Sequence, residues 1–326
     1  MQFGLRPLEG GTDFARTAAQ VERAEELGYD SVWLAEHYTD DDQWWPASLV
    51  TLAALAGRTD DIRLGSNILI TPLYNPVWLA SAVAMLDQVS DGRFVCGLGV
   101  GYDPTEFSAF GVPLDERVGR TVEATIAMKK LWTEESVTYH GEHVDLEEYG
   151  VTPKPVQDPH PEVWYGVWGD YLLSQAAKRA DAWVPGAVAD LEQLARRQQV
   201  YDDALAEYHG ADASPAQRPL VRDVVLGETR AAALERAREH LGEKYEVYAG
   251  RGHQFFADYH EVGFEAFVED RVVLGTPDDC IEQLGRYADE LGTDHFLLRF
   301  NYPGMSAEAV TADMETIAAE ILPAFD

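Results

Sequence analysis

The stretch SVWLAEHY (residues 31–38) begins as an apolar run and ends on a carboxylate, an imidazole and a phenol in succession. A short continuous apolar run is typical of a strand that is buried on both faces. Three titratable side chains in a row are rare inside a hydrophobic core. The stretch therefore predicts a buried strand that ends at a polar edge, where Glu36, His37 and Tyr38 emerge.

The same pattern recurs along the chain, because short apolar runs alternate with longer helical patterns. The expected strands cover residues 2–6, 31–37, 62–70, 93–100, 162–168, 182–186, 220–227 and 294–300. The expected helices cover residues 13–27, 47–58, 77–89, 118–132, 172–179, 190–208, 231–241 and 307–321. Apolar strands separated by helices indicate a parallel sheet whose faces are covered by those helices.

Eight strand–helix units predict an α/β fold of the closed (β/α)₈ type, a TIM barrel, as a single domain over residues 1–326. Two segments fall outside the repeat and predict insertions after the fourth and seventh strands, at residues 133–161 and 243–275. In such a barrel the catalytic groups lie at the C-terminal ends of the strands. His37 is therefore expected at the rim where the chemistry takes place.

The charge balance is strongly acidic, with 57 Asp and Glu against 25 Lys and Arg and a net charge of −32. This excess argues against nucleic acid and anionic membranes as partners, because both would be repelled. The acids are spread along the chain rather than gathered in a tail. They predict a halophilic protein that stays soluble in high salt, where screening shortens self-repulsion to a few Å.

The sequence predicts a soluble cytoplasmic protein without a disulfide framework. The chain has two cysteines, Cys96 and Cys280, which are far apart and in no metal-ligand spacing, so no disulfide framework is expected. The first residues, MQFGLR, lack the features of a signal peptide, and no apolar run reaches the roughly 18 residues of a membrane helix. A histidine pair in YHGEHVD (residues 139–145) invites a metal site, but strand alternation would separate His140 from His143.

His37 is the leading catalytic candidate, because an imidazole can take or give a proton near neutral pH. Strand alternation should direct Glu36 to the opposite side. The alternative for His37 is a structural histidine that is bound by a backbone carbonyl. Pattern alone leaves both interpretations open.

Two glycine-containing strand ends are candidate cofactor contacts. CGLGVGYD (residues 96–103) closes the fourth strand, and its glycines would let the backbone approach a flat ligand or simply form a barrel turn. YGVWGDY (residues 165–171) precedes a helix whose free N–H groups would bind a phosphate, unless it is an ordinary βα turn. The polar pair Ser66 and Asn67 in the third strand implies either a ligand or a bulge.

The insertion at residues 243–275 is rich in aromatic residues. It predicts either a lid that excludes water from the site or a contact between subunits. The candidate substrate or lid residues are His253, Tyr259 and His260, together with Arg299 at the end of the last strand.

Taken together, these stretches resemble the luciferase-like flavin oxidoreductases over nearly the whole chain. The matching pieces are ELGYDSVWLAEHY (26–38), LAALAGRTDDIRLGSNILITPLYNPVWLA (52–80), MLDQVSDGRFVCGLGVGYDPTEFSAFGVPLDER (85–117), PKPVQDPHPEVWYGV (153–167) and DHFLLRFNYPGM (294–305). The resemblance implies a (β/α)₈ barrel that binds reduced flavin mononucleotide (FMN) or the deazaflavin coenzyme F420 at its C-terminal mouth.

The resemblance also implies a site. His37 would lie near the reactive face of the ring, with Tyr38 beside it as a weaker catalytic candidate, and a non-proline cis peptide bond would fall at Asn67–Ile68. The implied cofactor contacts are Ser66, Asn67, Ile68, Gly99, Val100, Gly101, Tyr102, Gly166, Val167, Trp168 and Gly169. Of these, residues 166–169 would hold the phosphate.

Two departures from the family pattern bear on the cofactor. Luciferases have a second histidine where this chain has Tyr38, and many FMN users have an arginine where this chain has Val100. The loss of that charge-assisted phosphate contact weakens the case for FMN.

Three functions follow as expectations. The first is a two-component monooxygenase that uses reduced FMN and O₂ on a small organic substrate, is supplied by a separate flavin reductase, and forms a homo-oligomer. The second is a hydride-transfer oxidoreductase that depends on F420, and the third is a flavin-binding subunit without turnover.

Overall fold

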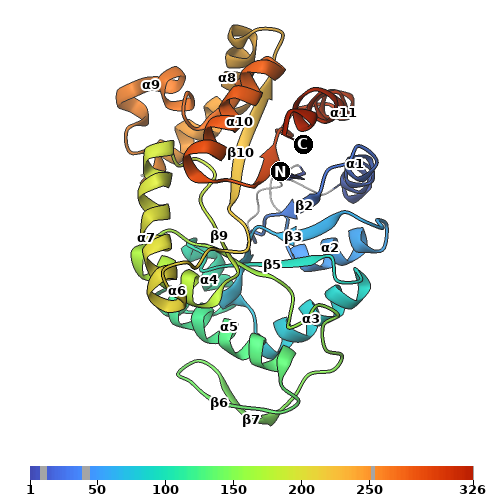
Figure 1. The fold of residues 1–326 in the computed structure, drawn as a ribbon, viewed down its shortest axis with the longest axis vertical. Coiled ribbons are helices and arrows are strands. Elements are labelled where there is room, and N and C mark those ends of the chain that lie inside the picture. Colours follow the sequence, from blue (N-terminus) through green and yellow to red (C-terminus); the bar gives the residue numbers. More distant parts are fainter. Residues whose placement is uncertain (8–12, 39–44, 251–253, 326) are drawn as a thin grey trace.

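The computed structural model describes residues 1–7, 13–38, 45–250 and 254–325. Its centre is a strongly curled parallel sheet with helices on the outside, as Figure 1 shows. The strands at the eight predicted positions are β1 (Gln2–Leu5), β2 (Ser31–Leu34), β3 (Arg63–Ser66) with β4 (Leu69–Ile70), β5 (Phe94–Gly99), β8 (Val163–Gly166), β9 (Ala182–Val184), β10 (Pro219–Leu226) and β12 (His295–Arg299). The hydrogen-bonded order is β11-β10-β12-β1-β2-β3-β5-β8-β9, which is the neighbour order of a barrel with one additional strand at its edge.

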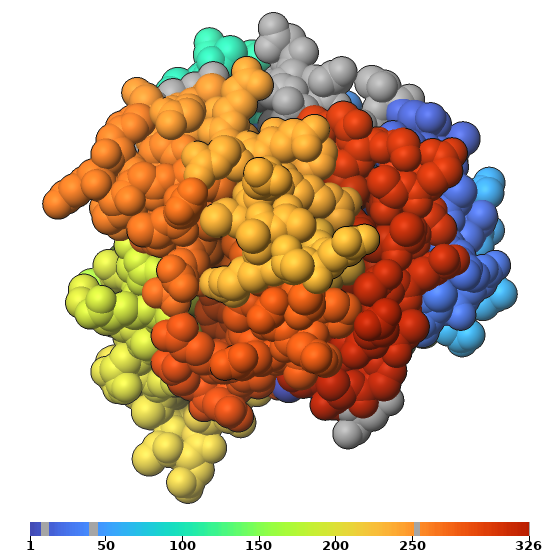
Figure 2. Space-filling model, turned by 90° about the horizontal axis from the view of Figure 1, so that it is seen from above, coloured from blue at the N-terminus to red at the C-terminus, as the bar shows by residue number. Residues whose placement is uncertain are grey.

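That additional strand is β11 (Val272–Gly275), which pairs in parallel with the C-terminal half of β10. The helices are α1 (Phe14–Glu26), α2 (Ser48–Ala56), α3 (Pro76–Val89), α4 (Pro104–Phe110), α5 (Arg117–Thr133), α6 (Asp170–Arg179), α7 (Leu191–His209), α8 (Arg230–Gly250), α9 (Tyr259–Val268), α10 (Pro277–Leu291) and α11 (Ala307–Thr316). No helix in these described ranges is long and apolar enough to cross a membrane. Figure 2 looks onto the face where α8, α9, α10 and α11 (gold to red) lie side by side.

The inside of the barrel is filled by side chains that alternate along the strands. The indole rings of Trp33 and Trp164 stack with their centroids 4.4 Å apart, and Val95, Val221 and Leu297 pack around them. Both rings are almost fully buried, since Trp33 is 1% and Trp164 0% exposed. The barrel interior is therefore a packed structure rather than a pore.

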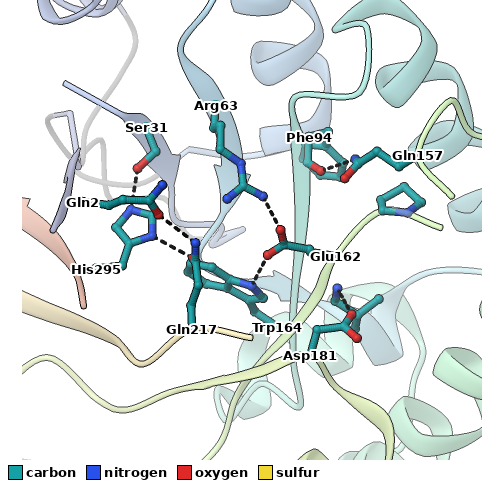
Figure 3. Close-up of polar contacts among 12 residues, drawn as sticks. Gln2, Ser31, Arg63, Phe94, Gln157, Glu162, Trp164, Asp181, Gln217 and His295 are labelled. Carbon is teal, nitrogen blue, oxygen red and sulfur yellow. Dashed lines mark hydrogen bonds and ion pairs between the residues drawn. The ribbon is translucent and has the colours of Figure 1, made fainter. Parts of the chain in front are cut away.

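A polar network closes the N-terminal end of the barrel (Figure 3). The Ser31 hydroxyl lies 2.8 Å from Nε2 of His295, and Nδ1 of His295 lies 3.0 Å from the Gln217 side-chain oxygen. On the other side of the same end, Arg63 pairs with Glu162 at 2.7 Å. The geometry of Ser31 and His295 resembles part of a nucleophilic triad, but both residues are completely buried. This network is therefore structural.

The two ends of the strand order meet at β9 and β10, and no hydrogen-bonded ladder joins these two strands in the described structure. The guanidinium of Arg222, on β10, is fully buried and donates to the carbonyl oxygens of Ala187 and Ala189, which follow β9. It also lies over the ring of Tyr287, 4.5 Å from the centroid. A side chain thus connects the two strands where backbone hydrogen bonds do not.

The two segments that the sequence assigned to insertions contain regular structure. Residues 133–161 hold an antiparallel hairpin of β6 (Val137–His140) and β7 (Asp145–Tyr149). Residues 243–275 hold the end of α8, the short 3₁₀ turn Gln254–Phe256, α9 and β11. Most aromatic rings of this second segment pack against one another in a buried cluster formed by Tyr245, Phe256, Tyr259, Phe264 and Phe267.

Candidate functional site

His37 follows β2 at the rim of the barrel and is bound by a carboxylate from a distant part of the chain. Its Nδ1 lies 3.1 and 3.3 Å from the two carboxylate oxygens of Glu106, on the first turn of α4. The Glu106 side chain is fully buried, whereas 17% of the His37 side chain is exposed. A carboxylate only accepts hydrogen bonds, so Nδ1 of His37 carries the proton and Nε2 is the acceptor in the neutral ring.

The carboxylate of Glu106 also accepts the backbone N–H of Tyr38 at 2.6 Å. The helix that carries it is short but well defined, because Asp103 caps it by accepting the N–H of Thr105 and Pro104 occupies its first position. The cap orients the first turn of α4 towards the end of β2. This arrangement fixes both the tautomer and the orientation of the imidazole.

Glu36 points away from His37, as strand alternation predicted, and is 2% exposed. One of its carboxylate oxygens accepts the N–H and the hydroxyl of Ser48, at 3.3 and 3.2 Å, and the other accepts the N–H of Ile70 at 3.0 Å. Burial raises the pKa of Glu36 above its usual value, while hydrogen bonds from the Tyr74 hydroxyl, the Ile70 N–H, Ser48 and Tyr38 oppose that rise. The residue connects β2, α2 and the turn after β4.

Two phenols complete this buried group. The Tyr74 hydroxyl donates to Glu36 at 2.5 Å, and the Tyr38 hydroxyl lies 2.8 Å from it and 3.2 Å from Glu36. Burial, followed by the charge of Glu36, raises the pKa of both phenols above the usual value. The structure therefore groups the hydroxyl of Tyr38 with Glu36 rather than with His37.

The backbone has a cis peptide bond between Asn67 and Ile68, at the position that the family resemblance implied. The glycines around it pack closely against neighbouring strands. A Cβ on Gly97 would lie 1.8 Å from the carbonyl oxygen of Ser66, and a Cβ on Gly99 would lie 2.3 Å from Cδ1 of Ile68. The Ser66 hydroxyl bonds to the Gly97 carbonyl and N–H, both at 2.9 Å. Neighbouring protein atoms therefore occupy the side of Gly97 and Gly99 on which a Cβ would project.

Gly166 belongs to the same arrangement, because a Cβ there would lie 2.6 Å from Cγ2 of Ile68. The start of α6, three residues further on, is more open. Gly169 is exposed, a Cβ on it would meet nothing within 4 Å, and α6 begins after it without a side-chain cap. No side chain caps the first N–H groups of α6. These groups are therefore available to bind an anion at the helix N-terminus.

Aromatic and basic side chains surround this helix start. The ring of Trp168 is in edge contact with Phe255, with centroids 4.6 Å apart, and the guanidinium of Arg197 lies 5.7 Å from the Trp168 centroid. Arg197 also forms an ion pair with Asp170. Val167 is buried, and its carbonyl accepts the indole N–H of Trp183 at 2.8 Å.

Val100, Gly101 and Tyr102 continue from β5 next to His37. The Tyr102 ring is 58% exposed and meets the imidazole of His37 edge-on, with centroids 5.7 Å apart. Gly101 has a φ of +68°, and Val100 is partly buried. This stretch brings an exposed phenol to the imidazole.

Arg299 lies at the end of β12 and is buried with a carboxylate partner. It binds Asp223 of β10 through Nε and Nη2, the latter at 2.6 Å, and Asp223 also accepts from the Tyr245 hydroxyl at 3.3 Å. Both members of the pair are almost inaccessible to solvent. The bidentate contact with Asp223 makes Arg299 part of the barrel structure beneath the mouth.

Two further candidates, Tyr259 and His260, lie on α9. Tyr259 is buried in the aromatic cluster, and His260 is exposed, with its Nδ1 3.7 Å from Glu246. His253 lies outside the described residues. His140 is exposed and pairs with Asp145 at 2.6 Å, and no group of three metal-ligating side chains occurs in the described part of the chain.

Sequence reasoning missed two members of the site, Glu106 and Tyr74. The signal for Glu106 was present in the sequence DPTE, where an aspartate cap and a proline predict a helix start that places the glutamate on the first turn. No comparable local signal identifies Tyr74 as the partner of Glu36.

Comparisons with known proteins place this site in a family. The family model for luciferase-like monooxygenases matches residues 1–295. A protein named F420-dependent glucose-6-phosphate dehydrogenase from Intrasporangium calvum is 28% identical over 349 residues, which cover 99% of this chain and 95% of that protein. The uncharacterized protein y4vJ from Sinorhizobium fredii is 28% identical over 184 residues, and there the match spans about half of each protein, 54% of this chain and 52% of the relative.

Solved structures of other proteins superpose on nearly the full length of this chain. Monooxygenase RslO1 from Streptomyces bottropensis superposes with a TM-score of 0.85 at 25% identity over 100% of both chains. The oxygenating constituent of 3,6-diketocamphane monooxygenase from Pseudomonas putida, in complex with FMN, gives 0.82 at 20% identity over 99% of this chain and 98% of that one. An F420-dependent secondary alcohol dehydrogenase with an F420–acetone adduct gives 0.81 at 21% identity over 100% of this chain and 99% of that one. The chain belongs to the luciferase-like monooxygenase family of oxidoreductases.

Proposed function

We propose that this protein is an F420-dependent oxidoreductase that transfers a hydride between the deazaflavin and a small substrate with a hydroxyl or carbonyl group. The observation that carries the proposal is the contact between Nδ1 of His37 and the buried Glu106. A carboxylate behind an imidazole stabilises the imidazolium that forms when the other nitrogen accepts a proton. Oxidation of an alcohol requires such a base for the hydroxyl proton.

The residues at the mouth fit a cofactor with a phosphate. The uncapped start of α6 at Gly169 offers N–H groups to it, and Trp168 would stand beside it. Val100 and Tyr102 would face the ring from the end of β5. A valine at position 100 supplies no charge to a terminal monophosphate, which favours the phosphodiester of F420 over the monophosphate of FMN.

His37 and Glu106 would then have separate roles in the reaction. Nε2 of His37 accepts the hydroxyl proton while the carbon that bears the hydroxyl loses a hydride and becomes a carbonyl carbon. Glu106 holds the proton on Nδ1 and stabilises the positive charge on the ring. Bound F420 supplies a two-electron carrier that accepts the hydride. In the reverse direction His37 returns the proton to the carbonyl oxygen.

The second candidate is the two-component monooxygenase with reduced FMN, O₂ and a separate reductase. It is favoured by the similarity to monooxygenase RslO1 at 25% identity over both complete chains. In that case His37 would hydrogen-bond a reacting oxygen instead of accepting an alcohol proton. The third expectation, a subunit that binds flavin without turnover, makes no use of the contact between His37 and Glu106.

Titration with each cofactor separates the candidates. We expect F420 to bind at micromolar concentration or tighter and FMN at least about tenfold more weakly, a difference of about 1.4 kcal/mol. We also expect F420 reduction with a panel of small alcohols under anaerobic conditions. Tighter binding of reduced FMN with substrate-dependent oxygen uptake would support the monooxygenase. Binding of either cofactor without turnover of any substrate would support the third candidate.

A further inference from the structure

The ends of β2 and β8 both direct a ring towards the interior of the barrel. Along each strand every second side chain faces the interior. Trp33 of β2 lies in the packed barrel interior, so His37, an even number of residues later, faces the same side. Trp164 of β8 lies in that interior too, so Trp168 also faces it. His37 and Trp168 therefore both lie above the packed core.

The end of β9 is covered by a ring from a distant segment. Val184 of β9 lies in the barrel interior, so Gly186 faces the interior as well. A Cβ on Gly186 would lie 2.7 Å from Cε2 of Phe255, which belongs to the 3₁₀ turn after α8. The Phe255 ring therefore occupies the interior side of the end of β9. Its edge contact with Trp168, with centroids 4.6 Å apart, joins the two rings.

A third ring follows β5 and lies beside the catalytic candidate. The Tyr102 ring is 58% exposed and meets the imidazole of His37 edge-on, with centroids 5.7 Å apart. Because β5, β8 and β9 are consecutive in the sheet, Tyr102, Trp168 and Phe255 follow one another around the mouth. We refer to these three residues as the aromatic arc.

The cations near the mouth are paired or buried. Arg299 and Asp223, at the ends of β12 and β10, bind each other and are almost inaccessible to solvent. Arg6, at the end of β1, is 6% exposed. Arg197, beyond Trp168, forms an ion pair with Asp170. An anionic substrate would therefore have to compete with a carboxylate of the protein or displace buried side chains.

The aromatic arc indicates the class of substrate. The inference rests on the proposed function, in which Nε2 of His37 takes the hydroxyl proton, so that the substituents of the reacting carbon lie beside the imidazole. Aromatic rings favour apolar and aromatic groups, through burial and through edge-on or offset contacts. We propose that the substrate carries an uncharged aromatic or alicyclic group next to its hydroxyl-bearing carbon, and that Tyr102 and Phe255 hold this group.

A sugar phosphate has the opposite properties. Glucose 6-phosphate, which the name of the Intrasporangium calvum relative includes, is polar and anionic. The net charge of −32 repels such a molecule at long range. Its hydroxyls would also lose hydrogen bonds to water against aromatic rings. The proposed substrate class therefore differs from the one in that name.

Binding without cofactor provides the first test. Saturation-transfer NMR of the cofactor-free chain should detect 1-phenylethanol and not glucose 6-phosphate at equal concentration. Phe255→Ala should weaken binding of 1-phenylethanol about tenfold, because one aromatic contact is lost. Phe255→Leu should stay within about threefold of the native chain, because it keeps an apolar side chain against Gly186. The matched control is Tyr149→Ala on β7, a residue 46% exposed outside the arc, which should bind like the native chain.

Turnover provides the second test, with the cofactor identified by titration. The ratio of kcat/KM for 1-phenylethanol to kcat/KM for 2-propanol should fall about tenfold in Phe255→Ala, mainly through KM, because 2-propanol has no ring to lose. Tyr149→Ala should keep the native ratio. Circular dichroism establishes that Phe255→Ala is folded. If it is not, Tyr102→Ala tests the other end of the arc with the same expectation.

The outcomes separate this proposal from the proposed function. Preferential binding of glucose 6-phosphate would overturn the substrate class, and so would equal effects of Phe255→Ala and Tyr149→Ala. If no alcohol reduces F420 while Phe255→Ala still weakens binding of 1-phenylethanol, the substrate class is supported and the hydride transfer is wrong.

Discussion

Nδ1 of His37 lies 3.1 Å from the carboxylate of Glu106, although 69 positions separate the two residues in the chain. The contact joins the end of β2 to the first turn of α4 and leaves the imidazole partly exposed at the rim. A buried carboxylate that fixes the tautomer of a rim histidine is a positioning arrangement for acid–base chemistry. It also separates the roles of the two acids near the histidine, since Glu36 faces the other way.

Loss of His37 should lower turnover far more than it lowers cofactor affinity. His37→Ala is expected to reduce kcat by about 10²–10⁴-fold, because a general base contributes about that much. Glu106→Gln should cost roughly 10–100-fold, because the imidazole remains but is less well oriented. Steady-state kinetics with the cofactor identified by titration measures both effects.

The double variant is the control for these two effects. If Glu106 acts through His37, His37→Ala with Glu106→Gln should be no slower than His37→Ala alone. Multiplicative losses would show that Glu106 has an independent role, and full turnover in His37→Ala would remove the histidine from the mechanism.

Glu36 is expected to be a stability determinant. Glu36→Ala leaves the N–H of Ile70, the hydroxyl of Tyr74 and the donors of Ser48 without their acceptor in a buried environment. We expect a loss of about 2–4 kcal/mol in the free energy of unfolding, measured with urea at fixed protein concentration. Ser48→Ala, which removes one donor and keeps the acceptor, should cost about 1 kcal/mol. A change below about 0.5 kcal/mol in Glu36→Ala would contradict the assignment.

The free energy of unfolding should decrease as the pH is lowered, because of His295. Burial, with a smaller contribution from the charge of Arg63, lowers the pKa of His295 to about 3, whereas a histidine in the unfolded chain titrates near 6.5. Between these values the unfolded chain binds the proton and the folded chain does not. This group therefore lowers the free energy of unfolding by about 1.4 kcal/mol per pH unit as the pH falls well below about 6.5.

A glutamine at this position isolates the effect. His295→Gln should be less stable than the native chain at pH 7, and the difference should shrink steadily towards pH 4, since glutamine does not titrate. Urea unfolding at pH 7, 6, 5 and 4 provides the comparison. Parallel curves for the two proteins would mean that folding does not change the pKa of His295.

The acidic charge should make stability depend on salt. At −32, self-repulsion acts over about 10 Å in 0.1 M salt and about 3 Å in 1 M salt. The melting temperature should therefore rise from dilute buffer to 1 M KCl, measured by calorimetry. Sucrose at equal osmolality is the control, because it strengthens burial without screening charge. A flat or falling curve in KCl would argue against the halophilic interpretation.

The alternation of apolar runs and helices was enough to predict the barrel strands and the position of His37, because a parallel sheet that is buried on both faces leaves a strong apolar signal. The prediction missed the helices α4, α9 and α10 and the strand β11. The four residues Val272–Gly275 are too few to stand out beside the aromatic segment. The start of α10 did carry a signal, since Thr276, Pro277 and Asp279 form a capped helix start.

The site was less predictable because its contacts join distant segments. Strand alternation correctly separated Glu36 from His37, but it does not indicate that Glu106 arrives from α4. Tyr38 was expected beside His37. Because Tyr38 is two residues from Glu36, both side chains point to the same side of the strand end, and the Tyr38 hydroxyl contacts Glu36. Arg299 was predicted as a site candidate at the end of the last strand, but no local pattern indicates that Asp223 on the neighbouring strand binds it.

Ile68 lies between two glycines, and this arrangement has a consequence for how the sequence can change over time. Gly99 on β5 and Gly166 on β8 both border its side chain, so three positions that are distant in the sequence share one volume. A relative that acquires a side chain at either glycine needs a smaller residue at position 68. Substitutions at positions 68, 99 and 166 should therefore be inherited together, and a glycine conserved at these positions would reflect packing between strands.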